Sequence, residues 1–200
     1  MTALYAAAAH AFAAQVRALP AGAWDGPGLG DWDVRALVGH TSRSLVTVST
    51  YVQTAAERED VSSPQDYYAK IRDYASNVGA ADIVERGRQA GRALGDDPAS
   101  AVDALVVKAL DDVAAVDDPL IAVIGGLGIR LSNYLPTRVF EFAVHGLDIA
   151  RATGIPYSQR DVLAEAAALA ARIAAEVGAG EDVLLALTGR GALPEDFSVV

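Results

Sequence analysis

Four ionisable residues share one stripe of the apolar segment TRVFEFAVHGLDIARATG, residues 137–154. Glu141 and His145 are four residues apart, and in a helix this spacing places both side chains on one face. A carboxylate oxygen and an imidazole nitrogen at that spacing could ligate one divalent metal ion. Arg138 lies three residues before the glutamate, and Asp148 lies three residues after the histidine. The spacing therefore permits a metal site, but it equally permits a salt bridge between Glu141 and Arg138 with His145 as a hydrogen-bonding neighbour.

Because this segment is largely apolar, the charged residues of the stripe are expected to be buried and to need compensation. An unpaired carboxylate buried among Phe140, Phe142 and Val144 would cost on the order of several kcal/mol. A cation must compensate that charge, either a metal ion or Arg138. A third ligand from another segment would favour the metal.

His40 is the histidine best placed to supply that ligand, since it belongs to a second predicted helix. A polar stripe follows it at helical spacing, formed by Arg43, Ser44, Thr47 and Tyr51. Taken alone, a buried seam of hydroxyl groups explains this stripe as well as a functional site does. His10 has no acidic or histidine neighbour at helical spacing, and we interpret it as incidental.

The composition predicts an all-α protein without cysteine chemistry. Hydrophobic residues make up 52% of the 200 residues and aromatic residues only 6%, and the alanine-rich sequence favours helices. The net charge of −10 disfavours a nucleic-acid partner. Because the chain has no cysteine, any thiol chemistry would need a small-molecule thiol.

The periodicity predicts four long helices around one core, with shorter accessory helices. Asp33 is expected to cap the second helix, with Trp32 packing on Leu37, and Pro136 is expected at the first position of the helix that carries Glu141. Residues 120–135 predict a short strand or an irregular pair. The expected helices cover residues 2–19, 33–57, 64–95 (weakened at Gly79), 99–116, 136–154 and 160–177, with one short helix in the tail.

Two further features of the sequence are a group of tyrosines and an apolar N-terminal segment. The aromatic residues Tyr67, Tyr68 and Tyr74 at helical spacing indicate packing, although a pocket at the mouth of the bundle could use them. The apolar N-terminal segment lacks a basic start, so we expect no signal peptide, no membrane partner and a cytoplasmic location.

Two motifs resemble a known family. GDWDVRALVGHTSRSL and YLPTRVFEFAVHGLDIARATG are similar to the two motifs of the mycothiol-dependent maleylpyruvate isomerase N-terminal domain, in the DinB-like superfamily. The resemblance covers most of residues 1–155. It implies a DinB-like four-helix bundle that holds a divalent metal ion, usually zinc, through His40, Glu141 and His145.

The resemblance also implies a chemistry. Three protein ligands leave an open position on zinc, and a thiol bound there is deprotonated. The thiol would be mycothiol, acting in S-transfer to a small electrophile or in its cis–trans isomerisation. The alternative is a non-catalytic protein that binds or sequesters a metal ion or a small molecule on the same bundle. Arg138 and Asp148 are then expected to orient the ligands or balance charge, and the candidates for the thiol and substrate pocket are Arg43, Ser44, Thr47, Tyr51 and Arg130.

The sequence departs from the family pattern after the second motif. The isomerase carries an α/β domain that supplies an arginine for substrate, and the 46 residues after Gly154 are too few for that domain. We expect a metal-binding bundle over residues 1–155 and a helical extension, residues 156–200, packed on the same domain, in a monomer or homodimer. Whether Arg190 reaches the site is left open by the sequence.

Overall fold

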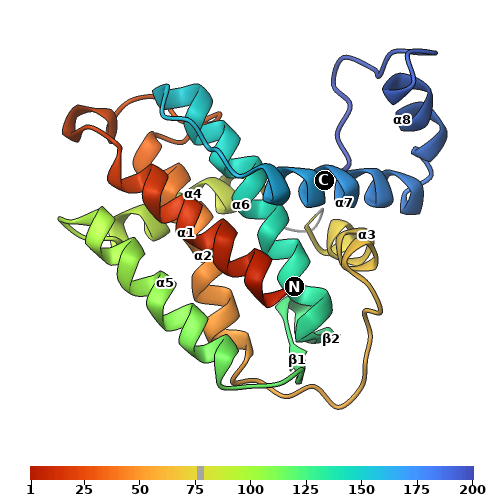
Figure 1. Ribbon diagram of the computed structural model, residues 1–200, viewed down its shortest axis with the longest axis horizontal. Coiled ribbons are helices and arrows are strands. Elements are labelled where there is room, and N and C mark those ends of the chain that lie inside the picture. Colours follow the sequence, from red (N-terminus) through yellow and green to blue (C-terminus); the bar gives the residue numbers. More distant parts are fainter. Residues whose placement is uncertain (76–78) are drawn as a thin grey trace.

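Helices make up most of the computed structural model, which describes residues 1–75 and 79–200 (Figure 1). Two short strands, β1 (Leu120–Ala122) and β2 (Gly128–Arg130), pair antiparallel. The predicted all-α fold is confirmed, apart from this small hairpin. The α-helices of the described residues are α1 (Thr2–Arg17), α2 (Val34–Tyr51), α3 (Pro64–Ala75), α4 (Ala80–Ala93), α5 (Pro98–Ala114), α6 (Leu131–Thr153), α7 (Arg160–Glu176) and α8 (Gly180–Leu187).

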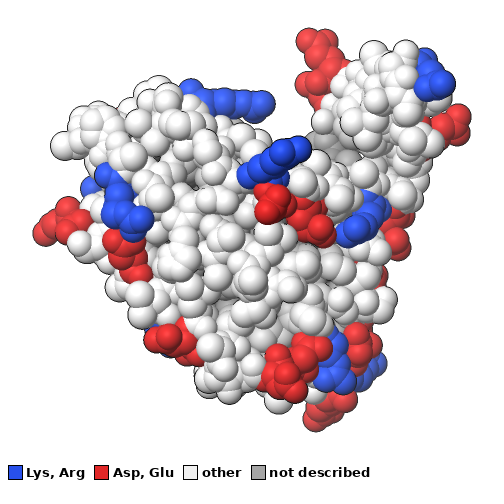
Figure 2. All heavy atoms as spheres, viewed as in Figure 1, with Lys and Arg blue, Asp and Glu red and all other residues white. Residues whose placement is uncertain are grey.

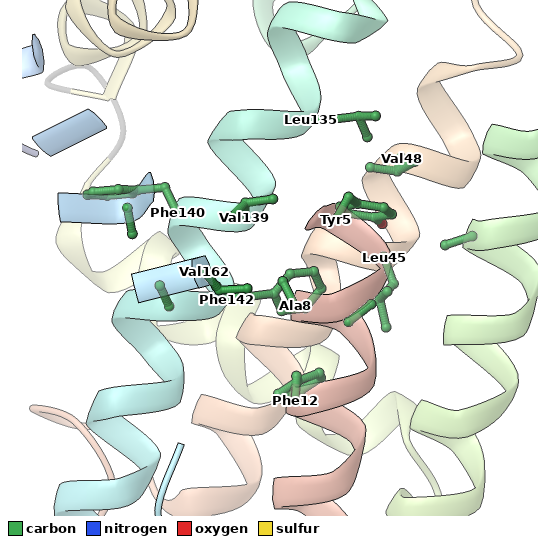
Figure 3. Close-up of a cluster of buried hydrophobic side chains, with 14 of the residues drawn as sticks. Tyr5, Ala8, Phe12, Leu45, Val48, Leu135, Val139, Phe140, Phe142 and Val162 are labelled. Carbon is green, nitrogen blue, oxygen red and sulfur yellow. The ribbon is translucent and has the colours of Figure 1, made fainter. Parts of the chain in front are cut away.

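The core lies between four of these helices, because α1 and α2 each pack on both α5 and α6. The aromatic rings of Phe12 and Phe142 lie 5.4 Å apart at their centroids, and Tyr5 stacks on Phe142 at 6.0 Å. Aliphatic side chains from α2 and α6 surround these rings. Figure 3 shows the cluster, whose labelled members include Tyr5, Ala8, Phe12, Leu45, Val48, Leu135, Val139 and Phe142.

The start of α2 is as predicted, but its end is not. The Asp33 carboxylate accepts a hydrogen bond from the Ala36 amide at 2.7 Å, which confirms the N-cap. The helix ends at Tyr51, so the predicted extension to residue 57 is wrong. Residues 54–56 instead lie along β1, where the Ala56 amide donates to the Leu120 carbonyl at 3.1 Å. Pairing with a strand distant in sequence thus ends the helix.

Helix α6 begins five residues before its predicted start. Its first residue is Leu131, and Pro136 lies inside the helix. The side chain of Asp118 replaces the missing cap, since it accepts from the Ser132 amide at 2.7 Å and from the Ser132 hydroxyl at 2.9 Å. The hairpin brings Asp118 to this position, so the first turn forms ahead of the proline.

The predicted weakness at Gly79 is confirmed as a boundary, with α3 on one side and α4 on the other. Helix α4 lies directly on α2. A Cβ atom on Gly39 would come within 2.1 Å of the Gly91 backbone nitrogen, so no side chain fits between the two helices at this point. Both helices have a glycine there. Residues beyond α6 form α7, which packs on α6 and α3, and α8, which packs on α7 (Figure 1).

Figure 2 shows acidic and basic side chains in scattered groups over this face, often as neighbours, with uncharged surface between the groups. Among the described helices, none combines the length and the apolar character that crossing a bilayer requires. The cytoplasmic location and the boundary near residue 155 stay predictions.

We expect the substitution Phe12→Ala to lower the free energy of unfolding by about 3–5 kcal/mol, because it opens a cavity between α1 and α6. Phe12 is 0% exposed, whereas Val107 on α5 is 61% exposed. Val107→Ala is therefore the control and should change stability by no more than about 0.5 kcal/mol. Urea denaturation measures both, and equal effects of the two substitutions would contradict the placement of the core.

Candidate metal centre

The three residues predicted as ligands converge at the contact between α2 and α6. Within the described residues, His40, Glu141 and His145 form a cluster in which one ligand atom from each lies within 4.8 Å of the others. The Nε2 atom of His145 lies 3.3 Å from Oε2 of Glu141, one helical turn away. The ring of His40 meets the edge of His145 at 4.9 Å between centroids. Helical spacing on α6 and packing of α2 together build this cluster.

Asp148 orients His145 from the far side. Its Oδ2 atom lies 3.2 Å from Nδ1 of His145, so the imidazole lies between two carboxylates. With Nδ1 on Asp148, Nε2 is the nitrogen turned toward Glu141. A carboxylate behind a histidine fixes the tautomer and the orientation of the ring in many metal sites.

Glu141 is held by groups from two helices. The Tyr68 hydroxyl of α3 donates to its Oε1 atom at 2.7 Å, and the Arg138 guanidinium lies 4.0 Å from the same oxygen. Arg138 itself lies over the rings of Tyr134, at 4.8 Å, and Tyr67, at 5.6 Å. The predicted salt bridge and the predicted cluster of ligands are therefore both present around one carboxylate.

The tyrosines of α3 are the residues whose part in the site the sequence did not assign. Tyr67 and Tyr68 were predicted as packing residues, and both are buried, yet Tyr68 contacts Glu141 and Tyr67 contacts Arg138. Their helical spacing was the available signal, but only the docking of α3 on α6 decides what they meet. The side chain of Tyr74 lies outside the described part of the chain.

The imidazole of His40 is uncharged at neutral pH. Burial, reinforced by the nearby charge of His145, lowers the pKa of His40 from 6.5 to about 4. A neutral imidazole is the form that binds metal ions. His40 can therefore serve as a ligand at neutral pH without losing a proton.

His145 and Glu141 form a charged pair. Burial opposes the charge on each group, but the hydrogen bonds that His145 donates to Asp148 and Glu141 raise the pKa of His145 from 6.5 to about 9. Burial likewise opposes ionisation of Glu141, yet the hydrogen bond from His145 and the charge of Arg138 lower its pKa to about 2. A proton on His145 therefore occupies the place that a metal ion would take.

The donor set fits a divalent metal ion. The Nδ1 atom of His40 is buried, and no hydrogen-bond partner for it lies within the described residues. Leaving such an atom unsatisfied costs about 1–3 kcal/mol, which a neighbouring cation would offset. Two imidazoles and a carboxylate are a donor set typical of zinc sites that keep a position open.

A small cavity of about 150 Å³ adjoins the cluster. Four of the five predicted pocket residues line it. Tyr67, which the sequence left open as a pocket residue, also lines it, as do Tyr134, Ile71 and Ile124, which the sequence did not assign there. Arg130 does not, because it lies at the end of β2 against the Asp118 carbonyl at 3.2 Å and near Glu59. Arg190 follows α8, where it donates to the Thr188 carbonyl, and does not line the cavity. The lining residues are His40, Arg43, Ser44, Thr47, Tyr51, Tyr67, Ile71, Ile124, Tyr134, Arg138 and Glu141.

Comparison with known proteins bears directly on this site. The family model of the mycothiol maleylpyruvate isomerase N-terminal domain matches residues 5–150. The chain belongs to this family. The matched region contains all three residues of the cluster, whereas α7 and α8 lie beyond it. Searches of the curated proteins and of the solved structures found no match.

We expect Zn²⁺ binding at this cluster to release one proton from His145 from neutral pH up to its folded pKa of about 9. His145 is charged below its folded pKa and must be neutral to bind metal. The apparent affinity should therefore rise with pH, by roughly tenfold per pH unit, and level off above pH 9. Calorimetry in buffers of different ionisation enthalpy measures the released proton. The exposed His10 provides the control, since His10→Ala should leave this dependence unchanged. An affinity that is constant between pH 7 and pH 8.5 would contradict the arrangement.

Proposed function

We propose that this member of the mycothiol maleylpyruvate isomerase N-terminal domain family is a metal-dependent enzyme that uses mycothiol as a cosubstrate. Its reaction would be S-transfer to a small electrophile, or cis–trans isomerisation of one. The observation that carries the proposal is the convergence of His40, Glu141 and His145 beside a cavity, in a chain of this family.

The residues that would hold the metal are His40 from α2 and Glu141 and His145 from α6. When bound there, a divalent ion such as Zn²⁺ would act as a Lewis acid that stabilises the thiolate form of the cosubstrate. The chain supplies no cysteine, so the nucleophilic sulfur must come from that small-molecule thiol.

The surrounding residues have distinct supporting parts. Asp148 keeps Nε2 of His145 directed at the centre, through its contact with Nδ1. Tyr68 and Arg138 hold Glu141 from the α3 and α6 sides. These contacts limit rotation of two ligands whose side chains are only 13% and 23% exposed.

The cavity fits only the reactive end of a substrate. A volume of about 150 Å³ is well below the ~300–1,000 Å³ of typical ligand pockets, so the rest of the thiol or electrophile would extend toward solvent. Its walls combine aromatic rings with the guanidinium groups of Arg43 and Arg138 and the hydroxyl of Thr47, which donates to the Arg43 carbonyl at 2.7 Å. This lining would orient a small, partly polar group.

Both proposed reactions begin with one bond-forming step. The thiolate sulfur adds to an electrophilic carbon, and in an activated alkene the electron pair of the double bond moves to the neighbouring carbon. In S-transfer that carbon takes a proton and the carbon–sulfur bond remains. In isomerisation the new single bond rotates, the carbon–sulfur bond breaks, and the double bond and the free thiolate are restored.

We expect the purified wild-type protein to bind about one divalent ion per chain. The variants Glu141→Ala and His145→Ala should lose it, because each removes one ligand and leaves a buried neighbour unpaired. Elemental analysis measures the content, and His10→Ala serves as the matched control that keeps the metal. Wild-type protein that neither contains nor takes up Zn²⁺ would rule out the proposed enzyme.

Turnover separates an enzyme from a binding protein. With mycothiol and a panel of electrophiles, the enzyme should consume thiol or isomerise alkene over many cycles. Removal of the metal or the His40→Ala substitution should abolish this activity. Retention of one ligand per chain without turnover would instead favour the sequestering protein that uses the same cavity.

A further inference from the structure

His40 differs from His145 in what holds its ring. His145 contacts carboxylates through both nitrogens, whereas the buried Nδ1 of His40 lacks a hydrogen-bond partner within the described residues. Two other rings lie against the His40 ring. The His145 ring is nearly perpendicular to it at 4.9 Å between centroids, and the Trp32 ring is tilted by 33° to it at 4.5 Å.

Trp32 is itself firmly placed. It is 8% exposed, and its indole Nε1 donates to the Val84 carbonyl of α4 at 2.9 Å. The ring also lies against Gly87, where a Cβ atom would come within 2.4 Å of the indole. Its backbone belongs to a hydrogen-bonded turn, since the Gly28 amide donates to the Trp32 carbonyl at 2.8 Å. The indole is thus fixed by α4 on one side and by the turn before α2 on the other.

Helix α4, which holds the indole of Trp32, also packs directly on α2. Gly91 of α4 meets Gly39 of α2, the residue next to His40, at backbone distance. A shift of α4 would therefore move the Val84 carbonyl and Gly87 relative to His40. None of these residues contributes a ligand atom, but together they determine where the indole lies.

We propose that Trp32 is a positioning residue that sets the orientation of the His40 imidazole for metal binding, with Val84 and Gly87 of α4 as its support. The inference rests on the metal site proposed above. For His40, the tilted contact with the Trp32 ring would orient the imidazole as Asp148 orients His145.

The test is Zn²⁺ affinity, measured by competition with a chromophoric chelator, together with the visible spectrum of the Co²⁺-loaded protein. Trp32→Leu should weaken Zn²⁺ binding by about 10–100-fold, as expected for loss of a contact that orients a ligand. Trp32→Phe keeps an aromatic face and should retain most of the affinity and the wild-type Co²⁺ spectrum. Trp24→Leu, at the other tryptophan of the chain, is the control and should bind like the wild type.

A double-mutant cycle distinguishes positioning from a general loss of structure. If Trp32 acts through His40, Trp32→Leu should cause no further loss in a His40→Ala background. Should Trp32→Leu fail to fold, as judged by circular dichroism, Gly87→Ala displaces the indole without removing it and should weaken binding in the same His40-dependent way. Wild-type affinity in the folded variants, or an equal loss with and without His40, would overturn the proposal. A wild-type protein without Zn²⁺ binding would instead overturn the proposed metal site itself.

Discussion

The carboxylate of Glu141 lies in a bundle whose interior is largely apolar, and the need to compensate its charge governs the arrangement around it. Desolvation opposes the charge, while His145, Arg138 and Tyr68 together keep the group ionised, with a pKa of about 2. Removing any one of these contacts would leave the buried charge of Glu141 less fully compensated, which costs more than the contact itself contributes. The same negative charge favours a proton on His145, and in the proposed function a metal ion would take the place of that proton.

The helices contribute different groups to the site around Glu141. The central bundle supplies the candidate ligand atoms through α2 and α6, and the peripheral helices α3 and α4 add contacts to the groups around them. Tyr68 of α3 contacts Glu141, and α4 holds Trp32 against His40. The accessory helices are therefore part of the site's support as well as a cover for the core.

The sequence predicted that His40, Glu141 and His145 come together, and that Asp33 caps α2. Helical spacing indicated the Glu141–His145 pair, and the motif resemblance added His40. The N-cap depends on residues at the start of the helix, which the sequence shows directly. The sequence did not predict the end of α2 or the start of α6. Those boundaries depend on pairing with β1 and on the Asp118 carboxylate, which are contacts between segments distant in sequence. The part that Tyr68 has at the site was missed for the same reason, since helical spacing describes a face but not the helix that will dock against it.

X-ray absorption spectroscopy of the zinc-loaded protein, before and after addition of mycothiol, tests the central claim most directly. The account predicts two imidazole ligands and oxygen before addition, and a new sulfur ligand at about 2.3 Å afterwards. Because the chain contains no cysteine, a thiolate at the zinc must come from the added thiol. A coordination shell with fewer than two imidazoles, or one that gains no sulfur with mycothiol, would contradict it.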